Sequence, residues 1–243
     1  MKTKTSAKLP TKLQTKKHIS SKKSQSYLTS INHQLLNLLE EHRLVGIGDF
    51  THGCRDIPIF ITQLLDYIIK NTSKPIKLFT ENSAWRCENI MKHPKIIYQK
   101  PTMWNNRWPS GKLGAYAGYG AESPECLAFI KFIRKHRGRI TIIGADPDVL
   151  DRDEAMATTI LDGRLPKDEG YNIWYAANHH IDTSKYEEMN QKWVPNPHIQ
   201  RYFAGYHLKK KLGHDYCIVM SNAYKGVVRY NGVCIGDDCE YRI

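Results

Sequence analysis

The chain has 243 residues, of which 41% are hydrophobic and 10% aromatic, and it carries a formal net charge of +12. This composition is that of a globular protein with a sizeable core and excludes a chain that is disordered throughout. The N-terminal tail lacks the apolar core of a secretory signal, and no later stretch is long enough to span a membrane. We therefore expect an intracellular protein, cytoplasmic or nuclear, and not a secreted one.

Residues 1–25 form a Lys-rich tail. This stretch holds eight lysines, and no acidic residue occurs before Glu40. Low apolar content and repulsion between like charges predict that the tail is disordered, so the folded part is one α/β domain over residues 26–243. A polybasic arm of this kind can bind nucleic acid or another polyanion.

After the tail, helical and strand patterns alternate along the chain. Apolar spacing predicts helices over 27–43, 57–69, 84–91, 125–137, 152–161 and 199–212. Short apolar runs predict strands over 44–47, 74–82, 139–148, 171–181 and 215–224, followed by a terminal strand or hairpin arm over 226–236. Helical crossovers of this length require parallel strands, so we expect an α/β fold with a mostly parallel central sheet and flanking helices.

One long segment, residues 93–122, interrupts this alternation. It is rich in proline, glycine and aromatic residues, and loops of this length inside a compact domain are uncommon unless they are functional or disordered. Its aromatic side chains can stack on an apolar ligand or close the fold. The candidate substrate-binding residues are Trp104, Trp108, Tyr116 and Tyr119.

Each of the first four predicted strands ends in side chains capable of acid–base chemistry. These are Asp49 and His52 after the first, Glu81 at the second, Asp146 and Asp148 after the third, and His179 and His180 on the fourth. The carboxyl ends of parallel strands share one edge of a sheet, where α/β proteins bind their ligands. We therefore expect these groups to converge there.

Each of these residues also has a purely structural interpretation. Asp49 and Glu81 are suitable caps for the helices that follow them, and Asp146 can close the turn before Pro147. Neighbours on a strand point to opposite faces, so at most one of His179 and His180 should face the site.

Two mechanisms fit these residue types. In the first, neutral His52 acts as a general base on water, Asp49 orients its imidazole, and His180 stabilises the developing oxyanion. In the second, two histidines and two carboxylates chelate zinc, manganese or iron, which activates the water. The residue types leave both mechanisms open. The six cysteines include no CxxC pair, which argues against a zinc ribbon and a disulfide scaffold.

The chain resembles the erythromycin esterase-like superfamily, whose members carry GExxHG after the first strand, a glutamate ending the second and HNxH on a later strand. Here GDFTHG matches the first motif at Gly48, His52 and Gly53, FTEN matches at Glu81, and AANHHI matches at Asn178 and His180. The chain departs from the pattern at two positions. Asp49 replaces the family glutamate, and Ala177 replaces the first histidine of HNxH.

The resemblance implies a metal-independent hydrolase that cleaves an ester or related bond of a small molecule and needs no cofactor. It implies that His52 is the water-activating base and that Asp49, Glu81 and His180 surround it. The same broad fold is similar to the Tiki and ChaN-like groups, which leaves a metal-dependent hydrolase or metal-binding protein as one alternative. A second alternative is a catalytically degenerate member that binds a polyanion through residues 1–25.

Overall fold

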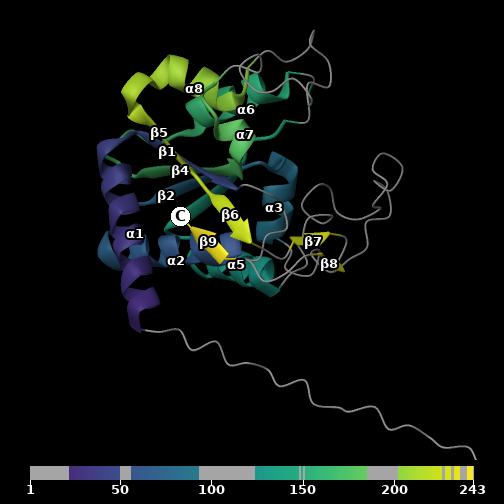
Figure 1. Cartoon of the computed structure of the whole chain (residues 1–243). Coiled ribbons are helices and arrows are strands. Elements are labelled where there is room, and N and C mark those ends of the chain that lie inside the picture. The colour runs from purple at the N-terminus through teal and green to yellow at the C-terminus, as the bar shows by residue number, and fades with distance from the viewer. Residues whose placement is uncertain are drawn as a thin grey trace, which may run out of the picture.

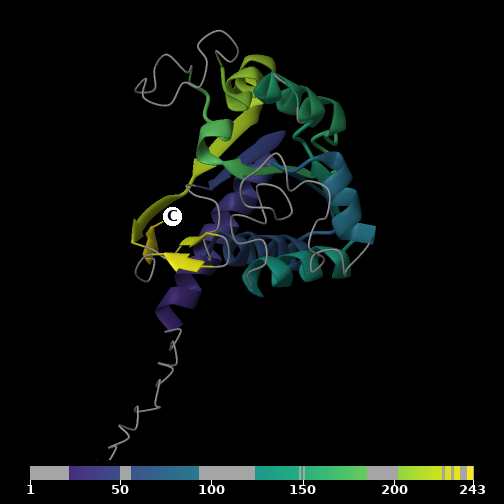
Figure 2. The ribbon, with the colours of Figure 1, turned by 90° about the vertical axis from the view of Figure 1, so that its right-hand side faces the viewer.

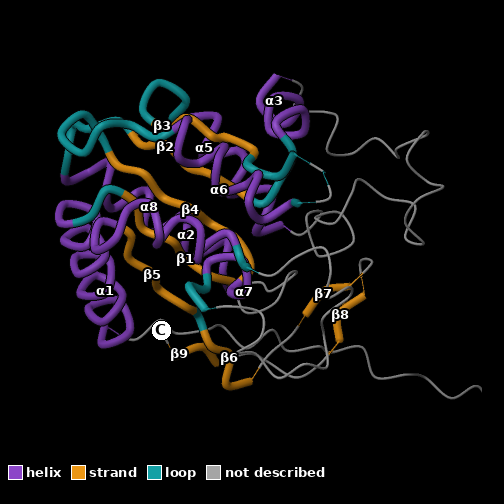
Figure 3. The backbone as a smooth tube through the Cα atoms, turned by 90° about the horizontal axis from the view of Figure 1, so that it is seen from above, coloured by secondary structure: helices purple, strands orange, loops and turns teal. Residues whose placement is uncertain are grey.

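The central element of the protein is a sheet of five parallel strands. The computed structural model describes residues 22–49, 56–92, 124–147, 149, 151–184, 202–225, 228–230, 233–235 and 240–242. The strands are β1 (Leu44–Asp49), β2 (Ile76–Thr80), β3 (Ile140–Gly144), β4 (Tyr171–Ala177) and β5 (Tyr216–Met220). Their order is β3-β2-β4-β1-β5, with every neighbouring pair parallel (Figures 1 and 3). The predicted α/β fold with a parallel sheet is confirmed.

Helices cover both faces of this sheet (Figure 2). One face packs against α1 (Lys22–Glu41), α2 (Asp56–Asn71) and α5 (Pro124–Lys135), and the other against α6 (Arg152–Gly163) and α8 (Ala204–Leu212). α3 (Ala84–Lys92) and the short α7 (Asn178–Ile181) lie beyond the carboxyl ends of the strands (Figure 3). No helix in the described ranges has the length and apolar character needed to cross a bilayer.

The pattern of buried side chains explains why the strands were recognisable. Every residue of β1 and of β4 is buried, as expected for strands covered on both faces. Alternate residues of β4 serve the two layers: Ile173 and Tyr175 join the core under α1, α2 and α5, whereas Trp174 and Ala176 join the core under α6 and α8.

Two predicted strands are wrong at their carboxyl ends. β4 stops at Ala177, and the next four residues form the helical turn α7, closed by Asp182 N donating to Asn178 O. The side chain of Asn178 donates to Ser221 O at 2.7 Å, which ties this turn to the end of β5. A Cβ atom at Gly48 would overlap the Asn178 side chain, so the turn needs a glycine beneath it.

The predicted strand over 215–224 is also two strands rather than one. β5 ends at Met220, and Ser221 N donates to Gly48 O at the last position where β1 offers a partner. The chain then leaves the main sheet as β6 (Asn222–Lys225), which pairs antiparallel with β9 (Glu240–Arg242).

Two further features lie near the ends of the described residues. β7 (Val228–Tyr230) pairs antiparallel with β8 (Val233–Ile235), which agrees with the hairpin alternative for the terminal segment. α1 begins at Lys22, which makes the last four residues of the predicted tail helical, and residues 1–21 lie outside the described ranges.

The close contact between α7 and α8 leads us to expect that one added methyl group at this junction lowers the stability of the protein. A Cβ atom at Gly205 would overlap the backbone carbonyl oxygens of Ile181 and Asp182, which cannot move aside as a side chain would. We expect Gly205→Ala to lower the free energy of unfolding by about 1–3 kcal/mol, measured by urea denaturation. Gly138→Ala is the matched control because a Cβ atom there meets nothing within 4 Å. Equal stability of the two variants would show that the junction is loose.

Candidate active site

The carboxyl ends of β2, β4 and β1 lie next to one another in the sheet. They bring together two carboxylates, those of Asp49 and Glu81, and the backbone of Ala177. Asp49, the last residue of β1, is in register with Ala177, the last residue of β4. On the other side of β4, the Glu81 carboxylate accepts a hydrogen bond from Ala177 N at 3.1 Å. Asp49 and Glu81 therefore flank the end of β4.

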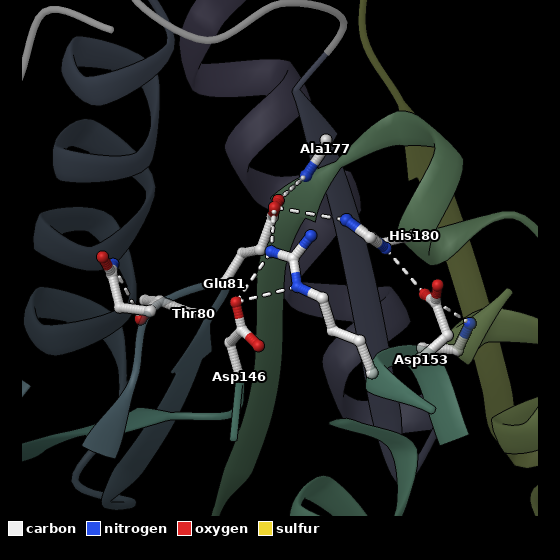
Figure 4. A network of polar contacts seen from close by, with 9 residues as sticks. Thr80, Glu81, Asp146, Asp153, Ala177 and His180 are labelled. Carbon is white, nitrogen blue, oxygen red and sulfur yellow. Dashed lines mark hydrogen bonds and ion pairs between the residues drawn. The ribbon is translucent and has the colours of Figure 1, made fainter. Parts of the chain in front are cut away.

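Glu81 is the centre of a buried network of charges (Figure 4). Its side chain is only 5% exposed, and its Oε1 atom lies 2.8 Å from Arg152 Nη2 and 3.2 Å from His180 Nε2. Its other oxygen receives the backbone N–H of Ala177. The carboxylate is thus bound by two cationic side chains and the end of β4, three residues before α3 begins at Ala84.

His180 lies between two carboxylates. Its Nδ1 atom is 2.6 Å from Asp153 Oδ1, and its Nε2 atom faces Glu81 at a distance typical of an ion pair but without hydrogen-bond alignment. Burial alone would lower the pKa of His180, but the negative charge of Glu81 and the hydrogen bond to Asp153 outweigh it and raise the pKa to about 9. At neutral pH His180 is therefore a buried imidazolium.

The different burial of His179 and His180 does not result from the alternation of side chains along a strand. Both residues lie in the helical turn α7, not on a strand as predicted, and their ring centroids are 4.0 Å apart. His180 is buried, whereas His179 is exposed. Only His180 contacts Glu81 and Asp153 in the described network.

Arg152 links the ends of β2 and β3. Its Nε atom donates to Asp146 Oδ2 at 2.8 Å, and its Nη2 atom donates to Glu81 Oε1. Burial works to lower the pKa of Arg152, but the hydrogen bond to Asp146 and the attraction of Glu81 prevail and raise it. The Asp146 carboxylate therefore binds the guanidinium of Arg152, which in turn binds Glu81. The structural interpretation of Asp146 as a residue that closes a turn did not include this contact.

Asp49 is buried beside this network. It is 4% exposed, and Tyr175 OH donates to its Oδ2 atom at 3.5 Å, a long hydrogen bond. Asp49 ends β1, and α2 begins seven residues later, at Asp56. The other candidates, His52, Asp148, Trp104, Trp108, Tyr116 and Tyr119, lie outside the described residues.

Sequence reasoning missed Arg152 and Asp153. Both belong to the first turn of α6, the helix that follows β3, and they appeared only as the start of an amphipathic segment. The first turn of a helix after a parallel strand faces the same sheet edge as the strand end, and two adjacent opposite charges there were the available signal.

The described residues offer no ready metal centre. No group of three or more His, Cys, Asp or Glu side chains in the described ranges could hold a metal ion. Glu81 and His180, which the chelation hypothesis would use, instead bind each other, Arg152 and Asp153.

Comparisons with known proteins find similarity in structure and not in sequence. No family model and no curated protein matches the chain. A Bacillus cereus protein of solved structure is similar, with a TM-score of 0.54, 12% identity, and coverage of 87% of this chain and 74% of that one. A histidine-to-asparagine mutant of the erythromycin esterase EreC in its open conformation is similar, with a TM-score of 0.50, 9% identity, and coverage of 80% of this chain and 75% of that one.

A third solved structure, a succinoglycan biosynthesis protein, has a TM-score of 0.50 and 14% identity, over 86% of this chain and 78% of that one. At these identities the likenesses concern the fold. The chain has an α/β fold that is shared with an erythromycin esterase.

The raised pKa of His180 predicts a pH-dependent stability. The folded-state value of about 9 lies above the ordinary value of 6.5. The stabilisation is therefore complete below about pH 6.5 and is lost as the pH rises through about 9, by up to roughly 3 kcal/mol. Urea denaturation across this interval should show the loss in the wild type and in His179→Gln, the exposed-histidine control. His180→Gln should lack it, and the same pH slope in all three proteins would refute the charged state.

Proposed function

We propose that the protein is a hydrolase that cleaves an ester or related bond of a small molecule, using a water activated by His52. The observation that carries this proposal is the buried Glu81–His180 charge pair beside Asp49 at the carboxyl edge of a parallel sheet. Ligands of α/β proteins bind at this edge. The fold shared with an erythromycin esterase and the motif resemblance support the same chemistry.

The assignment of the base follows from protonation states. His180 is an imidazolium at neutral pH and so has no lone pair with which to accept a proton from water. His52 follows Asp49 by three residues on the segment that leaves the end of β1. A neutral histidine can accept a proton from water and so serve as a general base.

In the proposed reaction His52 takes a proton from water while the oxygen forms a bond to the carbonyl carbon. The tetrahedral intermediate then expels the alcohol oxygen, which receives the proton from the His52 imidazolium. Asp49 orients His52, and the positive charge of His180 stabilises the oxyanion through the field of the site. Trp104, Trp108, Tyr116 and Tyr119 contact the substrate in this proposal.

The protonation of His180 and the contacts of Glu81 favour this mechanism over the chelation of a metal ion. A histidine that binds a metal must be neutral, whereas His180 is held protonated by Glu81 and Asp153. Glu81 also directs one oxygen to Arg152. A metal ion that bound Glu81 would therefore have to displace the cationic side chains of Arg152 and His180.

The proposal predicts ester hydrolysis that depends on His52 and resists chelators. We expect a panel of small esters, including a macrolide lactone, to be cleaved by the wild type equally with and without EDTA. His52→Ala should lower kcat/KM at least about 100-fold, because general-base catalysis contributes about 10²–10⁴. The control is His214→Ala, whose side chain is 92% exposed.

Three results would count against this function. Loss of activity with EDTA would support the metal-dependent alternative. Equal activity of the wild type and His52→Ala would exclude His52 as the base. An absence of hydrolysis across the panel, together with salt-sensitive binding of an oligonucleotide that requires residues 1–25, would favour the polyanion-binding alternative.

A further inference from the structure

Asp153 is a buried carboxylate that belongs to no motif in the sequence. It is 1% exposed and lies in the first turn of α6. Its Oδ1 atom accepts two hydrogen bonds, from His180 Nδ1 at 2.6 Å and from Ala204 N, at the start of α8, at 3.0 Å. One oxygen thus joins α6, α7 and α8 next to the Glu81 network (Figure 4).

The second oxygen of Asp153 makes this residue costly to bury. Oδ2 is inaccessible and has no hydrogen-bond partner among the described residues. A buried charge with an unsatisfied oxygen destabilises a fold unless an opposite charge compensates for it. An uncharged residue could hold α8 through a single acceptor, so the helix contact alone does not account for a carboxylate here.

The charges around His180 explain why a second carboxylate is needed. Glu81, at the end of β2, presents the same Oε1 atom to His180 and to Arg152. Arg152 therefore competes for the charge of Glu81 and also repels an imidazolium. The ring of His179 is the neighbour within α7, and the ring of Phe203, the residue before α8, meets His179 edge-on.

We infer that Asp153 is a positioning residue, which fixes the His180 ring and the proton on its Nδ1 atom, so that Nε2 faces Glu81 at the carboxyl edge of the sheet. A carboxylate on one imidazole nitrogen fixes the orientation and the protonation of the other, which is the logic of many catalytic and metal-bound histidines. Arg152 donates to the Glu81 Oε1 atom that faces His180, so adjacent residues of α6 fix both partners of the charge pair.

The matched test removes the charge of Asp153 and keeps its shape. Asp153→Asn retains an acceptor for Ala204 N but loses the carboxylate. We expect the pKa of His180 to fall from about 9 by about 1–3 units, the range for loss of a contacting opposite charge. NMR titration of protein labelled with ¹⁵N in its imidazole rings measures this value, with the His180 signals identified by their loss in His180→Gln. Glu154→Gln, an exposed neighbour on the same helix, should leave it unchanged.

An unchanged titration in Asp153→Asn would overturn the inference, even if that variant were less stable, because a purely structural role would alter stability alone. If the variant does not fold, the wild type still decides. In the wild type at pH 7, a proton on His180 Nδ1 that is held in the hydrogen bond to Asp153 supports the inference, and an Nδ1 atom without a proton overturns it, because the charge of Glu81 alone could raise the pKa.

A kinetic arm rests on the proposed function. If His180 must be charged for ester hydrolysis, the alkaline limb of the kcat/KM profile should move to lower pH in Asp153→Asn by the same number of units as the titration. A shifted titration without ester turnover in any variant would leave Asp153 as the positioning residue and would refute the esterase proposal alone.

Discussion

The ion pair between Glu81 and His180 is the interaction on which the arrangement of this sheet edge depends. Burying two charges is costly, and their attraction compensates only when further hydrogen bonds satisfy them. Here Arg152, Asp153 and the backbone N–H of Ala177 supply those bonds. Removal of any one partner leaves an unpaired charge in a low-dielectric interior, which is costly. We therefore expect the effects of substitutions in this group on stability to depend on one another.

This group of charges also connects elements that are far apart in the sequence. Glu81 follows β2, Asp146 follows β3, Arg152 and Asp153 begin α6, and His180 belongs to the turn after β4. Asp153 extends the connection to the start of α8. The carboxyl edge is therefore fixed by side-chain charges, whereas the sheet below it is fixed by apolar packing on both faces. Rigidity of this kind is what the preorganised catalysis proposed above requires.

The sequence predicted the strands and the position of Glu81 at the end of β2, because both depend on local patterns of residues. Strands buried on both faces are continuous apolar segments, and short helical crossovers allow only parallel pairing. The end of β4 was not accessible, since Asn178 leaves the sheet through a hydrogen bond to Ser221, which lies 43 residues later. Arg152 and Asp153 were missed because their partners, Glu81 and His180, come from other strands and become neighbours only in the folded sheet.

Glu81 and His180 form one charged pair whose members depend on each other, and a double-mutant cycle measures that dependence. Glu81→Gln, His180→Gln and the double variant are compared with the wild type by urea denaturation at neutral pH. We expect the double variant to be less destabilised than the sum of the single variants by at least about 1 kcal/mol. Effects that add within about 0.5 kcal/mol would contradict it, because they would show two residues that do not depend on each other.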